Sequence, residues 1–166
     1  MEFMRLNLLS SNARSLNDPT AVDSLKLYIQ DCQPTLDIIF IQEHKRRGEA
    51  LLQLGPPLWR QATSYGLDAS PAYGNEDDDP GAGCGGTISK LSPRLAHAVS
   101  ATGQLFDNRV HSLILSSRPV GDLGIANVYA HNSSSERCHL WEAMARELPP
   151  HCRWLLLGDL NMVESK

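Results

Sequence analysis

The chain has 166 residues, of which 42% are hydrophobic and 20% are charged, and its formal net charge at pH 7 is −4. These values are typical of one ordinary globular domain with a substantial core, and they exclude a disordered chain. A negative net charge argues against a protein that coats nucleic acid, but it does not exclude an enzyme that meets phosphates through a metal ion.

No segment approaches the ~18 consecutive apolar residues that a membrane-spanning helix needs, and the N-terminus lacks the features of a secretory signal. The four cysteines stand at irregular spacings: Cys32, Cys84, Cys138 and Cys152. This pattern favours reduced thiols in an intracellular protein, nuclear or cytoplasmic, that does not associate with a membrane.

Two strands are predicted near the N-terminus, and a polar side chain stands at the end of each. Apolar residues alternate with other residues from Met4 to Leu8, which predicts a strand that runs into Asn12. Residues 37–42 contain a continuous apolar run of the type that is buried on both faces of a sheet, and Glu43 follows it.

A helix is predicted between these strands. Asp18 is a good N-cap residue, and Pro19 suits the first helical position. Pro34 closes a segment in which apolar residues recur at helical spacing, namely Val22, Leu25, Ile29 and Cys32.

The middle of the chain gives less definite patterns. Residues 46–58 give no firm prediction, and residues 59–65 predict a strand. Residues 66–86 are rich in Gly, Pro, Asp and Ser. They predict a mobile surface loop rather than a linker, because neither flank is large enough to fold alone.

The second half predicts further strands and one helix. Ser133 and Glu136 have the capping-box spacing, and they open a helix that Pro149 ends. Residues 116–122 predict a hairpin connection. The helix has the apolar stripe Trp141, Met144, Ala145 and Leu148. The predicted strands are 87–91, 94–99, 110–115 and 123–130. This order of strands and helices predicts α/β layers with mixed sheets.

The last predicted strand leads into a polar motif. The apolar run 153–157 is followed by Gly158, Asp159, Leu160 and Asn161. At strand periodicity the Asp159 carboxylate and the Asn161 carboxamide project on the same side. Their oxygen atoms suit a hard divalent cation and an activated water.

Four strand ends thus carry polar side chains that could face a metal or a phosphate. They are Asn12, Glu43, Tyr129 with Asn132, and Asp159 with Asn161. Each motif alone has an ordinary explanation, because strand ends often carry Asn or Asp in turns and a strand tyrosine is commonly a core residue. The ordered series is more informative than any single member.

In this order the motifs resemble the endonuclease/exonuclease/phosphatase superfamily, over nearly the whole chain. The segments that carry the resemblance are LLSSNARSL at 8–16, IFIQEHK at 39–45, NVYAHN at 127–132 and LGDLN at 157–161. Residues 133–141 are similar to the branch formed by the endonucleases of non-LTR retrotransposons. The resemblance implies a four-layer α/β sandwich and hydrolysis of phosphodiesters, most simply in DNA.

The resemblance also implies roles for the metal-site residues. Glu43 would hold Mg²⁺ or Mn²⁺, and Asn12 would help to hold the metal or the scissile phosphate. Asp159 would orient or deprotonate the attacking water, and Asn161 would position Asp159 or the phosphate.

Three further residues would contact the phosphate or the nucleic acid. The resemblance implies a hydrogen bond from Tyr129 to a phosphate oxygen, with Asn132 supporting it from the following loop. Lys45 lies in a basic run that could steady a nucleic-acid backbone, although a solvated loop explains this run as well.

The chain departs from the family pattern in two places. Arg14 stands where the family commonly has a short polar or acidic residue. The family's closing motifs, an Asp and an Asp-His pair, lie downstream of the Gly-Asp-x-Asn motif, whereas this sequence stops at Lys166. Residues 1–166 are therefore expected to form a single partial domain, the N-terminal two-thirds or so of the sandwich.

Weak or absent catalysis is expected from such a partial domain, unless a partner supplies the missing C-terminal strands. Four alternatives stay open at this point: a DNA endonuclease, a phosphatase of the same superfamily, a non-catalytic remnant that binds nucleic acid or protein, and a fragment without a stable fold.

A zinc site is not expected from the sequence. The pair Cys138 and His139 and the pair His151 and Cys152 flank one predicted helix. The two residues of each pair would point to opposite sides, and neither pair has the usual C-x₂-C spacing.

Overall fold

The computed structural model describes residues 5–32, 36–45, 60–65, 86–106, 109–117 and 121–162. The predicted loop 66–86, apart from Gly86, lies outside these residues. In chain order the elements are β1 (Leu8–Asn12), α1 (Pro19–Asp31), β2 (Ile38–Gln42), β3 (Arg60–Tyr65), β4 (Thr87–Leu91), α2 (Pro93–Ala96), β5 (Val99–Leu105), β6 (Val110–Ser117), β7 (Gly121–Tyr129), α3 (Ser134–Glu147) and β8 (Arg153–Asp159).

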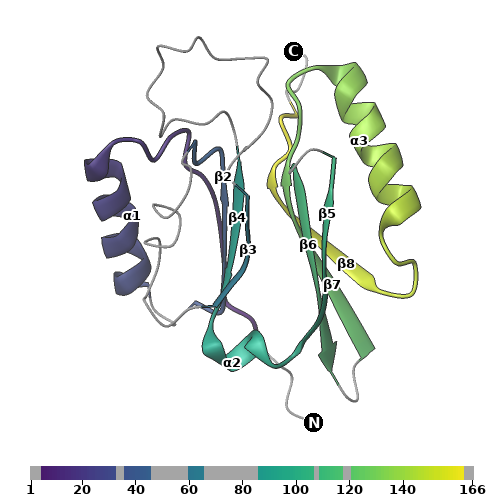
Figure 1. Ribbon diagram of the computed structural model, residues 1–166, viewed down its shortest axis with the longest axis horizontal. Coiled ribbons are helices and arrows are strands. Elements are labelled where there is room, and N and C mark those ends of the chain that lie inside the picture. The colour runs from purple at the N-terminus through teal and green to yellow at the C-terminus, as the bar shows by residue number, and fades with distance from the viewer. Residues whose placement is uncertain are drawn as a thin grey trace.

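The strands form two four-stranded sheets with the orders β1-β2-β4-β3 and β5-β6-β7-β8. Figure 1 shows the sheets face to face, with α1 outside the first and α3 outside the second. One hydrophobic cluster lies between the sheets, one lies under α1 and one lies under α3. The predicted four-layer α/β sandwich is therefore confirmed.

β2 shows why a continuous apolar run belongs in this fold. Ile39 and Ile41 pack in the cluster under α1, whereas Ile38 and Phe40 pack between the sheets. All four side chains are fully buried. Because successive side chains of a strand point to opposite faces, a strand covered on both faces must be apolar at every position.

Each sheet contains one pair of parallel strands, and the carboxyl ends of both pairs lie at the same end of the sandwich. β1 runs parallel to β2, with Asn12 opposite Gln42, and β7 runs parallel to β8, with Tyr129 opposite Asp159. The remaining pairings are antiparallel. This topology gathers the four polar strand ends of the sequence at one end of the sandwich.

The predicted strand 94–99 is wrong. Residues Pro93–Ala96 form the short helix α2, and the strand begins only at Val99 and runs to Leu105. Pro93 stands in the first turn after Ser92, where its fixed φ favours a helix. The sequence pattern missed the rest of β5 because its residues are mostly small or polar and partly exposed.

The two long helices begin where the sequence predicts, but their details differ. Asp18 caps α1 as expected and accepts a hydrogen bond from the Thr20 amide at 2.9 Å. The capping box of α3 does not form, because Glu136 pairs with His131 instead. Ala145 is exposed, and the buried residues of α3 are Leu140, Ala143 and Met144.

β8 is one of the two edge strands of the second sheet among the described residues, and β5 is the other. Two of the β8 leucines stay in contact with solvent, Leu155 at 38% and Leu156 at 41% exposure. None of the helices in the described part of the chain is long and apolar enough to cross a membrane.

Candidate active site

A side-chain hydrogen bond joins the two sheets at the carboxyl ends of their strands. Asn12, the last residue of β1, donates from Nδ2 to Oδ2 of Asp159, the last residue of β8, at 2.5 Å. The two residues are 147 positions apart in the sequence. Two of the predicted site residues thus contact each other directly.

The Asp159 carboxylate is fixed from a second direction. Its Oδ1 accepts a hydrogen bond from the Asn161 amide at 2.9 Å, and the Asn161 side chain donates to the Ala130 carbonyl at 2.5 Å. Both carboxylate oxygens therefore accept a hydrogen bond from the protein, which leaves their remaining lone pairs to face a ligand. The structure brings Asn161 to a place where it positions Asp159.

Glu43 follows β2 and forms an ion pair with Lys45 at 3.1 Å. The Glu43 side chain is 22% exposed, so it is partly buried and still in contact with solvent. All five described residues other than glycine with positive φ lie at this end of the sandwich: Arg14, Glu43, Lys45, Phe106 and Asn161. Such costly backbone conformations concentrate at functional sites.

Tyr129 lies in the same group of side chains. Burial raises the pKa of the Tyr129 phenol, and the carboxylate of Glu43 raises this pKa further. The Arg109 guanidinium lowers the same pKa by a smaller amount. Asp159 also raises the pKa, which places the hydroxyl within the field of both carboxylates. The phenol therefore stays protonated at neutral pH and can donate a hydrogen bond.

Arg109 is a member of this group that the sequence did not suggest. Its Cζ lies 5.0 Å from the centroid of the Tyr129 ring, a cation–π distance. Its Nη1 also donates to the Tyr129 carbonyl at 3.4 Å. Arg109 precedes β6, and only the pairing of β6 with β7 brings it to Tyr129, so no local signal in the sequence could have found it.

Asn132 is placed differently from the other predicted site residues. Its side chain is exposed, and its carbonyl oxygen accepts a hydrogen bond from Arg137 at 2.6 Å. The structure thus fixes the backbone of the loop after β7. It does not bring the Asn132 side chain into the hydrogen-bonded group of Asn12, Asp159 and Asn161.

A buried polar network lies directly below the site, between the sheets. Gln42, the residue before Glu43, donates to Asn127 Oδ1 at 2.6 Å and to Ser10 Oγ at 3.2 Å. Asn127 donates to the Ile88 carbonyl at 3.0 Å. Gln42 and Asn127 are at most 1% exposed. Because buried polar groups are costly when unpaired, this network holds the end of β2 in one position.

Replacing Asn127 with Ala is expected to lower the free energy of unfolding by about 2–4 kcal/mol, because the Gln42 amide and the Ile88 carbonyl each lose a buried partner. Urea denaturation measures this change. The matched control is Asn17→Ala at an exposed position, for which a change below ~0.5 kcal/mol is expected. Equal effects of the two substitutions would contradict the role of the network.

His111 makes the fold sensitive to acid. Burial lowers its pKa from 6.5 to about 3, and its ring lies 3.3 Å from the Ser89 hydroxyl. Between these two pH values His111 is protonated in the unfolded chain and neutral in the folded chain. The free energy of unfolding therefore falls as the pH is lowered from 6.5, by at most ~1.4 kcal/mol per pH unit.

Urea denaturation at pH 7, 6, 5 and 4 tests this effect. We expect the decline to be shallower in His111→Gln than in the wild type, because only the wild type gains that proton on unfolding. His97→Gln, at an exposed histidine, should keep the wild-type slope. The same slope in all three proteins would show that His111 does not cause the acid sensitivity.

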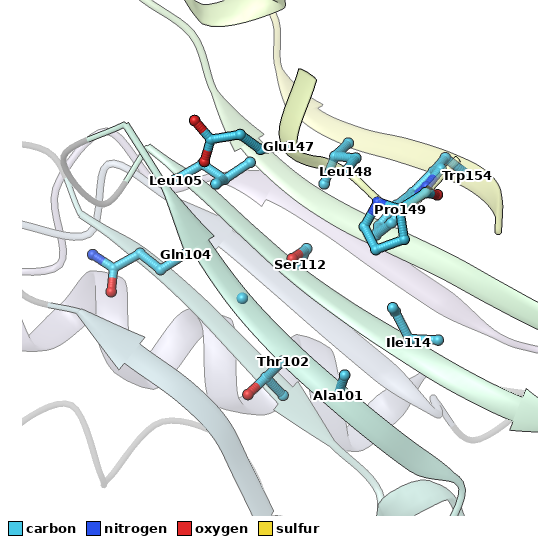
Figure 2. Close-up of a pocket in the computed structure, with 11 residues that line it drawn as sticks. Ala101, Thr102, Gln104, Leu105, Ser112, Ile114, Glu147, Leu148, Pro149 and Trp154 are labelled. Carbon is cyan, nitrogen blue, oxygen red and sulfur yellow. Dashed lines mark hydrogen bonds between the residues drawn. The ribbon is translucent and has the colours of Figure 1, made fainter. Parts of the chain in front are cut away.

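The pocket drawn in Figure 2 lies elsewhere. It has a volume of about 170 Å³ and is lined by residues of β5 and β6, by the end of α3 and by Trp154 of β8. None of the predicted strand-end residues lines it. The strand-end residues therefore form a group separate from this pocket.

The donor atoms at the strand ends fit a hard divalent cation. Glu43 and Asp159 offer carboxylate oxygens, and Asn12 offers a carboxamide oxygen that already accepts a hydrogen bond from the Arg14 amide at 2.8 Å. Oxygen ligands of this kind suit Mg²⁺ and Mn²⁺, which keep several water ligands. The described group contains no thiolate or imidazole that would favour a softer ion.

Two mixed sheets with a helix on each outer face, and an oxygen-rich site at the ends of their parallel strands, place the chain in the class of α/β sandwiches with a candidate cation site at one end. The sequence profile of the Endonuclease/Exonuclease/phosphatase family matches residues 6–165, and the chain belongs to this family. Members of this family generally use divalent metals.

A solved structure supports the fold. The human Nocturnin catalytic domain with bound sulfate anion is similar to this chain, with a TM-score of 0.61 and 15% sequence identity. The similarity covers 97% of this chain and 65% of that domain, so the chain spans less than two-thirds of the Nocturnin domain. No curated protein matches the sequence.

Proposed function

We propose that this chain carries a Mg²⁺- or Mn²⁺-dependent site for phosphodiester hydrolysis, and that its substrate is DNA, cleaved internally as by the endonucleases of non-LTR retrotransposons. The observation that carries the proposal is the hydrogen bond between Asn12 and Asp159, which unites two strand ends of different sheets. Family membership supports the reaction class, and the sequence similarity of residues 133–141 favours the retrotransposon branch.

Asp159 is the proton acceptor in this proposal. Two hydrogen bonds hold its carboxylate, so it meets the attacking water in a fixed orientation. Tyr129, kept protonated by burial and by Glu43, donates a hydrogen bond to a non-bridging phosphate oxygen. Asn161 keeps Asp159 in place.

Glu43 and Asn12 supply the oxygen atoms that hold the cation, which neutralises negative charge on the phosphate when it is bound. Lys45, now paired with Glu43, is close enough to the site to contact a phosphate oxygen. Asn132 contacts the nucleic-acid backbone from the exposed loop, outside the hydrogen-bonded group.

The 166-residue chain by itself is expected to be a slow enzyme. The two histidines nearest to these motifs in the sequence make other contacts: His44 is fully buried against Gly86, and His131 contacts Phe106 and Glu136. Loss of a general acid or base typically lowers a rate by ~10²–10⁴-fold. In this proposal residues 1–166 act as one partial domain, and added strands on the β8 edge, from a partner, restore the rate.

Non-catalytic binding of nucleic acid is the second candidate, and the placement of these histidines favours it. A phosphatase of the same superfamily is the third. Hydrolysis of a phosphodiester, bis(p-nitrophenyl) phosphate, and of a monoester, p-nitrophenyl phosphate, distinguishes the three in the presence of Mg²⁺. The proposal predicts turnover of the diester in preference to the monoester.

Preference for the monoester would support the phosphatase and contradict the proposal. Salt-dependent binding of a DNA duplex without hydrolysis of either compound would support the binding function. The exposed substitution Glu142→Gln on α3 serves as the matched control and should leave all three readouts unchanged.

A further inference from the structure

A second group of potential metal ligands lies at the opposite end of the second sheet. One carboxylate oxygen of Asp122, one imidazole nitrogen of His151 and the sulfur of Cys152 all lie within 4.8 Å of one another. It is the one group of at least three such residues found among the described parts of the chain.

The strand register explains why these residues meet. β7 and β8 are parallel, and Leu123 lies opposite Arg153. Asp122 and Cys152 immediately precede these two residues, so they stand side by side at the amino ends of the strands. The candidate active site lies at the carboxyl ends of the same strands, so the two groups are separated by the full length of the sheet.

The backbone that carries His151 and Cys152 is held in place. The Cys152 amide donates to the Pro149 carbonyl at 3.3 Å, and the Trp154 ring nitrogen donates to the same carbonyl at 2.9 Å. The Trp154 ring packs so closely on Gly124 that a Cβ there would lie 2.5 Å from it. The turn after α3 is therefore anchored to β7 before any ligand binds.

Asp122 is also oriented. Ser116 donates from its hydroxyl to Asp122 Oδ1 at 2.8 Å, which fixes the carboxylate and leaves the other oxygen available. An outer hydrogen bond of this kind is a usual feature of metal-binding carboxylates. Cys152 is buried at 8% exposure, and His151 is exposed, so its ring has room to move.

We propose that Asp122, His151 and Cys152 bind a borderline-soft divalent cation of the zinc type. A thiolate with an imidazole and a carboxylate favours such an ion over Mg²⁺, and three protein ligands leave the fourth tetrahedral position to water. Metal–ligand bonds of 2.0–2.3 Å place ligand atoms roughly 3.3–3.8 Å apart. Because the three ligand atoms lie within 4.8 Å of one another, rotation of the exposed His151 side chain has to close a gap of at most roughly 1.5 Å.

This set differs from the four residues that the sequence suggested and disfavoured. Cys138 and His139 are exposed on α3 and are not part of the group. The third residue of the group is Asp122, which only the pairing of β7 with β8 brings next to Cys152. A bound ion would tie the turn between α3 and β8 to the beginning of β7.

Titration of the purified full chain with Co²⁺ tests the site, because a thiolate ligand gives a charge-transfer absorption band that oxygen ligands do not give. We expect one such band, displaced stoichiometrically by Zn²⁺, in the wild type. It should vanish in Cys152→Ser, and the Zn²⁺ affinity should fall in His151→Ala by at least the ~10–100-fold typical of losing even an outer partner.

The matched controls are Cys138→Ser and Glu43→Gln. The first removes an exposed cysteine outside the group, and the second removes the carboxylate of the candidate active site. Both should keep the band and the Zn²⁺ affinity. Absence of the band from folded wild-type protein, its persistence in Cys152→Ser, or its loss in Cys138→Ser would each overturn the proposal. Circular dichroism of each variant establishes that it is folded.

Discussion

Asp159→Asn is expected to lower the rate of phosphodiester hydrolysis by ~10²–10⁴-fold. The carboxamide has the same size as the carboxylate, and its single oxygen can still accept the hydrogen bond from the Asn161 amide. Its NH2 group then faces the Asn12 Nδ2 that donated to the second carboxylate oxygen, so that hydrogen bond is lost. The carboxamide cannot accept a proton from water, so the substitution removes the proposed chemistry and keeps the size of the side chain. Initial rates of plasmid nicking at saturating Mg²⁺ measure the effect.

The control for this substitution is Asp23→Asn on α1. The Asp23 side chain is 72% exposed and pairs with Lys26 on the same helix. Its rate should stay within about twofold of the wild type, since a surface substitution of this kind perturbs the fold little. A loss below ~10-fold for Asp159→Asn would be too small for a general base.

Gly158→Ala is expected to produce the largest loss of stability, about 2–5 kcal/mol. A Cβ at this position would lie 1.9 Å from the Val128 carbonyl oxygen, which belongs to the neighbouring strand and cannot move freely. The residue also has a φ of +136°, which adds strain for any residue with a side chain. Overpacking costs about 1–3 kcal/mol, and the backbone strain adds roughly 1–2 kcal/mol.

Gly121→Ala separates the two causes. Gly121 has a φ of +87°, but nothing lies within 4 Å of its Cβ position. This substitution should therefore cost only the backbone strain, about 1–2 kcal/mol, in the same urea denaturation experiment. If the two substitutions were equally destabilising, close approach of β7 to Gly158 would not be the reason for the glycine.

The strand ends were predictable because each polar residue follows a pattern that local sequence shows. The continuous apolar run before Glu43 and the run before Asp159 define buried strands, and strand periodicity fixes where the next residues point. The structure adds what a single strand cannot show, namely that Asn12 and Asp159 meet across two sheets.

Other features depend on tertiary contacts and left no local signal. Arg109 reaches Tyr129 only through the pairing of β6 with β7, and Gln42 and Asn127 look like unremarkable strand residues until the sheets pack. The wrong prediction at residues 94–99 has a local cause, because the apolar residues there are typical of a strand, whereas Pro93 after Ser92 starts the helix α2.

The most direct test of the proposed function is nicking of supercoiled plasmid DNA by the purified chain in Mg²⁺, compared with the same reaction in EDTA and with the variants Glu43→Ala and Asp159→Ala. The strand-end site predicts slow nicking by the wild type that disappears in all three comparisons. Nicking that survives EDTA or either substitution, or no nicking by protein shown to be folded, would contradict a metal-dependent hydrolytic site at these residues.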